Sequence, residues 1–178
     1  MWTLQDAPLS TRLRRMATWA QLLERRPDIA EPGLRLLYPT YAGVGLAYLS
    51  TVRLDGGPRV HPMCPIITEG GVFALIVAGP KRNDLVRDGR YAMHSFPTDA
   101  NEDGIYLTGR ATAVEVQAML DLLVTEFLEE RQALGLTKAD VSSQVPFAFD
   151  IDTAMLTRTT GHGDPHPQHL IWHAEIPE

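Results

Sequence analysis

Three β-forming segments joined by two tight turns lie between residues 45 and 78. The segments read GLAYLSTVR, RVHPMCPII and VFALIVA, and the turns between them read LDGGP and TEGG. Asp55-Gly56-Gly57 is a strong hairpin signal, and turns this short leave no room for a helical crossover. We therefore expect an antiparallel meander. Pro62 and Pro65 interrupt the second segment, which places that segment at a sheet edge or makes it irregular.

The rest of the chain adds further strands and only two clear helices. Strands are expected at 91–96, 104–116, 147–159 and 169–176, and helices at 80–89 and 116–135. Strands that follow one another without regular helical crossovers favour a mainly β fold with accessory helices, built as a closed antiparallel barrel. We expect one domain over residues 1–178, with 116–135 as a peripheral helix.

Residues 1–40 are expected to form an N-terminal helical extension rather than a separate domain. Thr18 can cap a first helix, and Pro27 can open a second one. Pro32 and Gly33 are expected to interrupt that second helix.

The composition excludes several classes of protein. The 178 residues carry a net charge of −6, which is not the basic footprint of a nucleic-acid binder. No apolar run is long enough to span a membrane, and the N-terminus lacks the apolar centre of a signal peptide. A single cysteine, Cys64, excludes an intrachain disulfide, so we expect a cytoplasmic protein.

Two cations directly follow the third β-forming segment. Lys81 and Arg82 would occupy the first turn of the expected helix, where cations oppose the helix dipole unless an anion is bound. Arg59 begins the second segment and is expected at the same end of the sheet, so Arg59 and Lys81 can converge on one phosphate. The alternatives are a solvated turn balanced by Asp84, and an Arg59 that pairs with Asp55.

Three stretches together resemble one known family. LSTVRLDGGPRVHPMCPI, GPKRNDLVRDGRYAMHSF and YLTGRATAV are similar to the pyridoxamine 5'-phosphate oxidase-like family of FMN-binding split β-barrels, over residues 45–115. TWAQLLERRPDIA and WHAE resemble a bacterial subgroup of uncharacterised members. The resemblance implies an antiparallel split β-barrel that forms a homodimer and holds FMN at the dimer interface.

The resemblance also implies roles for particular residues. Arg59 and Lys81 match residues that hold the flavin phosphate, with Arg82 beside them. The segment Val60, His61, Pro62 and Met63 matches the strand beside the isoalloxazine ring, which would account for the prolines. Trp172 matches a C-terminal aromatic residue that the partner subunit supplies near the ring edge.

Three departures from the family pattern argue against the pyridoxamine phosphate reaction itself. Cys64 stands where those oxidases have a lysine, and apolar residues stand where many relatives have a threonine before the phosphate turn. The arginine that such oxidases direct at the vitamin phosphate is not visible in the C-terminal HLIWHAEIPE.

The histidines give candidates for tuning the cofactor and for binding metal. His61 and His94 are weak catalytic candidates on neighbouring strands, and each can equally be a structural barrel histidine. No nucleophile motif is present, and we name no catalytic base. His169 and His173 would share one face of the last strand and can reach substrate. A weaker alternative is a metal site at the C-terminal cluster of His162, His166, His169 and His173.

The sequence therefore predicts an FMN-dependent oxidoreductase that passes a hydride through the flavin to or from an unknown small-molecule substrate. One alternative is a reductase on the same scaffold that uses the 8-hydroxy-5-deazaflavin coenzyme, whose longer anionic tail would need further cations such as Arg82 and Arg87. The other is a non-enzymatic protein that carries flavin or haem.

Overall fold

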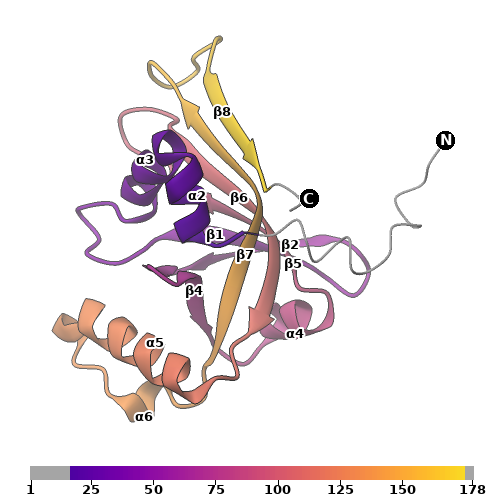
Figure 1. Cartoon of the computed structure of the whole chain (residues 1–178), viewed down its shortest axis with the longest axis vertical. Helices are drawn as coiled ribbons and strands as arrows, with labels where there is room; N and C mark the ends of the chain where they lie inside the picture. The colour runs from indigo at the N-terminus through magenta and orange to yellow at the C-terminus, as the bar shows by residue number, and fades with distance from the viewer. Residues whose placement is uncertain (1–16, 175–178) are drawn as a thin grey trace.

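A computed structural model describes residues 17–174 of the protein (Figure 1). The expectations for residues 1–16 of the helical extension and for residues 175 and 176 of the last strand lie outside the described residues. The described strands form one antiparallel sheet that curls into a half-barrel. The strands are β1 (Ala47–Val52), β2 (Pro58–Met63), β3 (Ile66–Thr68), β4 (Gly71–Ile76), β5 (Arg90–Ser95), β6 (Gly104–Ala113), β7 (Val145–Arg158) and β8 (Gln168–His173). The main path runs β2-β1-β5-β6-β7-β4-β3, and β8 pairs with β7.

The second β-forming segment is two strands rather than one. It breaks at Cys64 and Pro65, so that β2 pairs with β1 while β3 pairs with β4. Both expected hairpins form, β1 with β2 and β3 with β4, but the three segments do not make one continuous meander, because β2 and β4 are not neighbours. The ladder is also open rather than closed: β2 and β3 lie at its two ends and only two residues of chain join them. The prediction that the proline-containing segment is irregular and lies at an edge is confirmed.

The main core lies on the inner face of the sheet. One row of paired residues crosses six strands on this face, and paired residues in antiparallel strands point to the same side. The row consists of His61, Leu49, Met93, Leu107, Ala154 and Trp172. All of them except His61 are buried. This row fixes which side chains face the core and which face outward.

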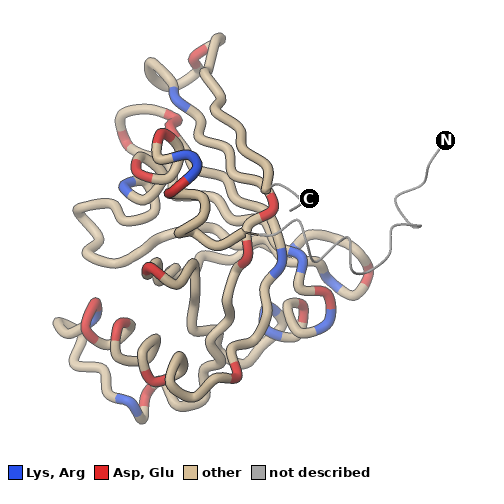
Figure 2. Tube along the Cα trace, in the orientation of Figure 1, with Lys and Arg blue, Asp and Glu red and all other residues tan. Residues whose placement is uncertain are grey.

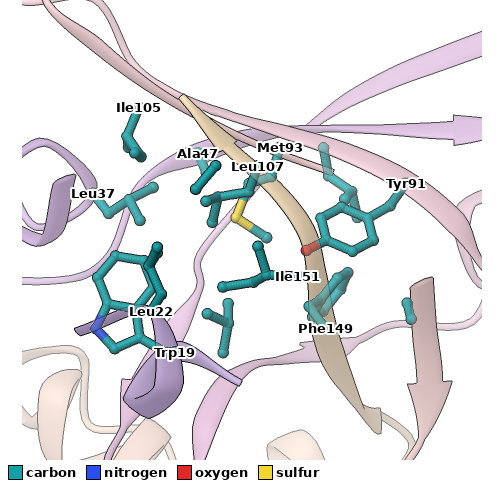
Figure 3. Close-up of a cluster of buried hydrophobic side chains, with 14 of the residues drawn as sticks. Trp19, Leu22, Leu37, Ala47, Tyr91, Met93, Ile105, Leu107, Phe149 and Ile151 are labelled. Atoms are coloured by element: carbon teal, nitrogen blue, oxygen red, sulfur yellow. The ribbon is translucent and has the colours of Figure 1, made fainter. Parts of the chain in front are cut away.

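Two N-terminal helices cover part of that inner face. They are α2 (Trp19–Arg25) and α3 (Pro27–Leu37), and they bury Trp19, Leu22 and Leu37 against the strands (Figure 3). Thr18 caps α2 in a capping box, as expected. The expected interruption of the second helix is wrong, since α3 continues through Pro32 and Gly33. The lack of a side chain at Gly33 lets α3 approach Ile105 of β6.

The C-terminal helical region packs on the other end of the sheet. It comprises α5 (Gln117–Glu130), a 3-10 turn (Gln132–Leu134) and α6 (Lys138–Val141), of which α6 was not predicted. Leu123 and Val141 form a second core cluster with Ile66, Phe73 and Leu75. No helix among residues 17–174 is long and apolar enough to cross a membrane.

A polar contact ties the end of α5 to the break between β2 and β3. The Tyr38 hydroxyl, at the end of α3, donates to the Pro65 carbonyl at 3.1 Å and contacts Glu130 Oε1 at 3.0 Å. The same hydroxyl accepts the Ile67 N–H at 3.0 Å. Gly45 lies against this point, and a Cβ there would come within 2.3 Å of the Pro65 carbonyl oxygen.

Gly109 marks the irregularity in the β6–β7 ladder, where the register shifts between Thr108 and Gly109. A Cβ on Gly109 would lie 1.9 Å from the Asp150 carbonyl oxygen. We therefore expect Gly109→Ala to lower the free energy of unfolding by about 3 kcal/mol, since backbone atoms must move to admit the methyl group. Urea denaturation measures the change. Gly70→Ala, whose Cβ would have no neighbour closer than 3.5 Å, is the control. Equal losses in the two variants would contradict the close approach.

Candidate functional site

Arg59 and His61 project from the inner face of β2, next to helix α4 (Pro80–Arg87). They alternate along the strand with the exposed residues Pro58, Val60 and Pro62. Lys and Arg gather around α4 and the adjoining β1–β2 turn, interspersed with acidic residues (Figure 2). The proximity of Arg59 to α4 was predicted. Its physical cause is different, because α4 packs under the β1–β2 hairpin and β4 does not pair with β2.

Asp84 of α4 is the centre of this contact. Its side chain is buried, and its Oδ2 accepts hydrogen bonds from Arg59 Nε at 2.8 Å and from Thr51 Oγ1 at 3.0 Å. Oδ1 accepts a hydrogen bond from Arg87 Nη2 at 3.2 Å. Burial raises the pKa of Asp84, but the hydrogen bonds from Arg59, Thr51 and Arg87 outweigh it and the net shift is downward. Asp84 is thus a buried, ionised and fully hydrogen-bonded carboxylate.

Asp84 is therefore not the partner of Lys81, and Arg59 does not pair with Asp55. In the β1–β2 turn, Asp55 instead pairs with Arg53 and accepts the Gly57 N–H. Both alternative pairings that the sequence offered are wrong. Sequence reasoning missed the role of Asp84, although its spacing of three residues from Arg87 on a helix was a usable signal.

Lys81 is half-buried at the start of α4, and no hydrogen bond or carboxylate partner for it lies among the described residues. Burial lowers its pKa, and a smaller electrostatic interaction with Cys64 acts in the opposite direction. A partly desolvated ammonium group with a shifted pKa and no counter-charge is a candidate for binding an anionic ligand. Lys81 is therefore the cation in this cluster that is most available to a ligand.

His61 lies between these charges. Its Nε2 is buried and has no hydrogen-bond partner within residues 17–174. Burial lowers the pKa of His61, the charges of Lys81 and Arg59 lower it further, and Asp84 has a weaker opposite effect. The ring is therefore held neutral, with one nitrogen open to a partner that the described protein atoms do not provide.

The backbone of β2 presents an unusual free edge. Arg53 N–H bonds to the Gly57 carbonyl, and hydrogen-bonded pairs alternate with non-bonded pairs in an antiparallel ladder. By this register, Arg59, His61 and Met63 bond to β1, while Pro58, Val60 and Pro62 direct their backbone groups outward. Prolines have no N–H, so this edge offers three carbonyls and a single donor, the Val60 N–H.

Comparisons with known proteins identify the fold. No protein-family model matches the chain, and no curated protein resembles it significantly in sequence. Solved structures do match. A haem binding protein from Mycobacterium smegmatis has a TM-score of 0.59 at 14% identity, covering 81% of this chain and 59% of that one.

Two further matches cover most of the other chain. One is a Clostridium acetobutylicum protein of the pyridoxinephosphate oxidase family, related to general stress protein 26 (TM-score 0.54, 13% identity, 86% and 95% covered). The other is HutZ, the haem storage protein of Vibrio cholerae (TM-score 0.54, 17% identity, 70% and 88% covered). The chain has the pyridoxamine 5'-phosphate oxidase-like split-barrel fold. At these identities the similarity concerns the fold.

In this split barrel, Val60, Pro62 and Met63 lie on β2 with Arg59, whereas the side chains of Arg82 and Trp172 are directed away from the Arg59–Lys81 cluster. Arg82 Nη1 donates to the Ser143 carbonyl at 3.0 Å, on the side of α6. Trp172 is only 8% exposed and belongs to the main core of its own chain, five strand spacings from His61. His94 pairs with Tyr48 on the outer face, so His61 and His94 lie on opposite sides of the sheet.

The C-terminal histidines of the split barrel are dispersed. His162 lies near Glu102, with His162 Nδ1 and Glu102 Oε1 3.8 Å apart. His169 and His173 share the outer face of β8, and their Nδ1 atoms contact the hydroxyls of Thr157 and Thr153, each at 3.0 Å. Within residues 17–174, no three His, Cys, Asp or Glu side chains come together as metal ligands. Nothing in this arrangement favours the metal alternative.

The neutral state of His61 makes stability depend on pH. Its pKa is lowered in the folded protein, so the unfolded chain binds protons more readily as pH falls through the ordinary value of 6.5. The folded state therefore loses stability from that pH downward, until the pH is below the folded pKa. We expect His61→Gln to flatten this part of the profile, as measured by urea denaturation between neutral and mildly acidic pH.

The matched control is His94→Gln, which removes an exposed histidine from the opposite face of the sheet. It is expected to leave the slope of stability against pH close to that of the wild type. Parallel profiles for the wild type and His61→Gln would show that His61 is not held neutral by its surroundings.

Proposed function

We propose that this split barrel binds FMN and acts as an oxidoreductase on a small-molecule substrate. The observation that carries the proposal is the half-buried Lys81, without a carboxylate partner in the described structure, beside Arg59 and the buried, unpartnered Nε2 of His61. When bound, FMN supplies hydride transfer at its flavin ring, and the protein supplies binding, orientation and electrostatics.

The cations fit a single phosphate group. Arg59 uses Nε on Asp84, which leaves its two terminal nitrogens for a bidentate contact, and Lys81 adds a point charge. Arg87 is already bonded to Asp84 and the Val52 carbonyl, and Arg82 is bonded to the Ser143 carbonyl. The further cations that a longer, more anionic deazaflavin tail would need are thus engaged elsewhere, which favours FMN.

The free edge of β2 fits the edge of a planar heterocycle. The Val60 N–H can donate to a ring acceptor, and the outward carbonyls of Pro58, Val60 and Pro62 can accept from a ring N–H. His61, held neutral on the same strand, can exchange a hydrogen bond with the bound group through Nε2. Met63 lies beyond it, buried at the end of the strand. These residues hold and orient the ring and do not require a protein base.

We further propose a homodimer that covers the outer face of the sheet. Another row of paired residues crosses this face, namely Pro62, Tyr48, His94, Tyr106, Met155 and Ile171. Tyr48 stacks on Phe96 and is 40% exposed, and Ile171 is 49% exposed. A second copy would bury this surface and bring its own His169 and His173, which lie on the outer face of β8, nearer to β2. A cytoplasmic location agrees with the single half-buried cysteine.

A second candidate function is haem binding without flavin chemistry. His169 and His173 are exposed, and each has its Nδ1 on a threonine hydroxyl. Where that Nδ1 carries the proton, Nε2 is left with a free lone pair in a fixed orientation, as in many iron-ligating histidines. The M. smegmatis and V. cholerae proteins of the same fold are described as haem binding and haem storage proteins.

Absorbance spectra decide between the two candidates. Protein mixed with FMN, and separately with haem, is passed through a desalting column. We expect a flavin spectrum at about one FMN per chain and no retained Soret band. A Soret band that His169→Ala or His173→Ala abolishes, with no flavin retained, would replace the FMN proposal by the haem one.

Lys81→Ala is expected to weaken FMN binding by about 1.5–3 kcal/mol, or roughly tenfold to 150-fold, as for a lost hydrogen bond to a charged group. Quenching of flavin fluorescence measures the dissociation constant. The chain has two lysines, so Lys138→Ala, at an exposed position on α6, is a matched control that should leave the affinity unchanged. Equal affinities in both variants and the wild type would remove Lys81 from the phosphate site.

A further inference from the structure

Asp84 is a carboxylate at the centre of a site proposed to bind an anion. It is only 3% exposed, and it contacts Arg59 from β2, Thr51 from β1 and Arg87 from its own helix. A buried carboxylate at this place repels a phosphate, and a buried ion pair adds little to stability beyond what apolar packing of similar volume would give. General stability therefore does not explain why a carboxylate is buried at this position.

The geometry of the contact between Arg59 and Asp84 explains the position of Asp84. Arg59 meets Asp84 through Nε, and no hydrogen bond from its terminal nitrogens to the described protein atoms is present. A guanidinium group held at Nε has its plane fixed, because rotation would break that bond. The two terminal nitrogens then form a free fork of the shape that phosphate oxygens accept. Thr51, opposite Arg59 in the ladder, holds the same carboxylate oxygen and fixes its position.

Asp84 also fixes where α4 lies. It joins the helix to both strands of the β1–β2 hairpin, and Arg87 adds bonds to Asp84 and to the Val52 carbonyl. Lys81 is on the same helix, three residues before Asp84. The Asp84 side chain thus sets both the orientation of Arg59 and the placement of Lys81 relative to Arg59.

We propose that Asp84 is the positioning residue of the anion site: it does not touch the ligand, but holds Arg59 with its terminal fork free and holds Lys81 beside it. This inference rests on the proposed function for the identity of the ligand. It predicts that loss of the carboxylate weakens binding of the anion, although the change removes a negative charge from the site. A residue with a merely structural role would change stability and leave the affinity intact, or improve it.

The test is a double-mutant cycle on FMN affinity, measured by fluorescence quenching at fixed ionic strength. The variants are Asp84→Asn, Arg59→Gln and the two combined. We expect about a tenfold loss for each single variant, on the scale of one hydrogen bond to a charged group. The loss in the double variant should be smaller than the sum of the two single losses, because part of the effect of Asp84 passes through Arg59. Asp88→Asn, at a carboxylate that pairs with Arg90 outside the cluster, is the control and should bind like the wild type.

Thr51→Val is a milder variant that tests the positioning role of Asp84 if Asp84→Asn does not fold. It removes the hydrogen bond to Asp84 Oδ2 with little change of shape, and a loss of about threefold in FMN affinity is expected. Wild-type affinity in Asp84→Asn or Thr51→Val would overturn the proposal. Losses that simply add in the double variant would do so too, since they would mean that Asp84 acts independently of Arg59.

A second probe separates this inference from the proposed function. Inorganic phosphate is titrated while the NMR signal of the Arg59 Nε–H group is followed. If the wild type does not retain FMN, yet phosphate shifts this signal in the wild type and not in Asp84→Asn, the FMN proposal fails and the positioning role stands. If neither FMN nor phosphate distinguishes the wild type from Asp84→Asn, the positioning role is refuted.

Discussion

The break at Cys64 and Pro65 is the constraint on which the rest of this structure depends. Because the second β-forming segment cannot continue as one strand, β2 stays at one end of the ladder and β3 pairs with β4 at the other. One edge of β2 therefore has no neighbouring strand, and helix α4 packs against the inner face of the β1–β2 hairpin. Tyr38, at the end of α3, bonds to the Pro65 carbonyl at the break and to Glu130 of α5. Helices distant in sequence therefore support the strand that carries Arg59 and His61.

The electrostatics of the site follow from that arrangement. Placing α4 under the hairpin buries Asp84 among Arg59, Thr51 and Arg87, and these hydrogen bonds more than compensate for its desolvation. Lys81, on the same helix, has no such partner in the described part of the chain, and His61 is kept neutral by burial and by the neighbouring cations. The buried Asp84 thus has its hydrogen-bond partners within the protein, whereas the neutral ring of His61 and the ammonium group of Lys81 have none in the described structure.

The sequence predicted most strands and the proximity of Arg59 to the helix that carries Lys81, but not how these elements meet. Turn signals such as Asp55-Gly56-Gly57 and the alternation of apolar residues are local, so strand positions were recoverable within a few residues. Contacts between distant segments are not local. The role of Asp84, the burial of Trp172 in its own core and the separation of His61 from His94 depend on register and packing. Pro32 was misread because the packing of α3, whose Gly33 lies against Ile105, overrides the local preference of proline.

The prolines of β2 have a consequence for the behaviour of the chain at high concentration. A free strand edge is normally a template on which another chain can add a strand, and this is a common origin of aggregation. Pro58 and Pro62 leave a single N–H on that edge, so an incoming strand would find carbonyls without the matching donors. The same two prolines that would face the proposed planar ligand therefore also oppose the addition of a strand at this edge.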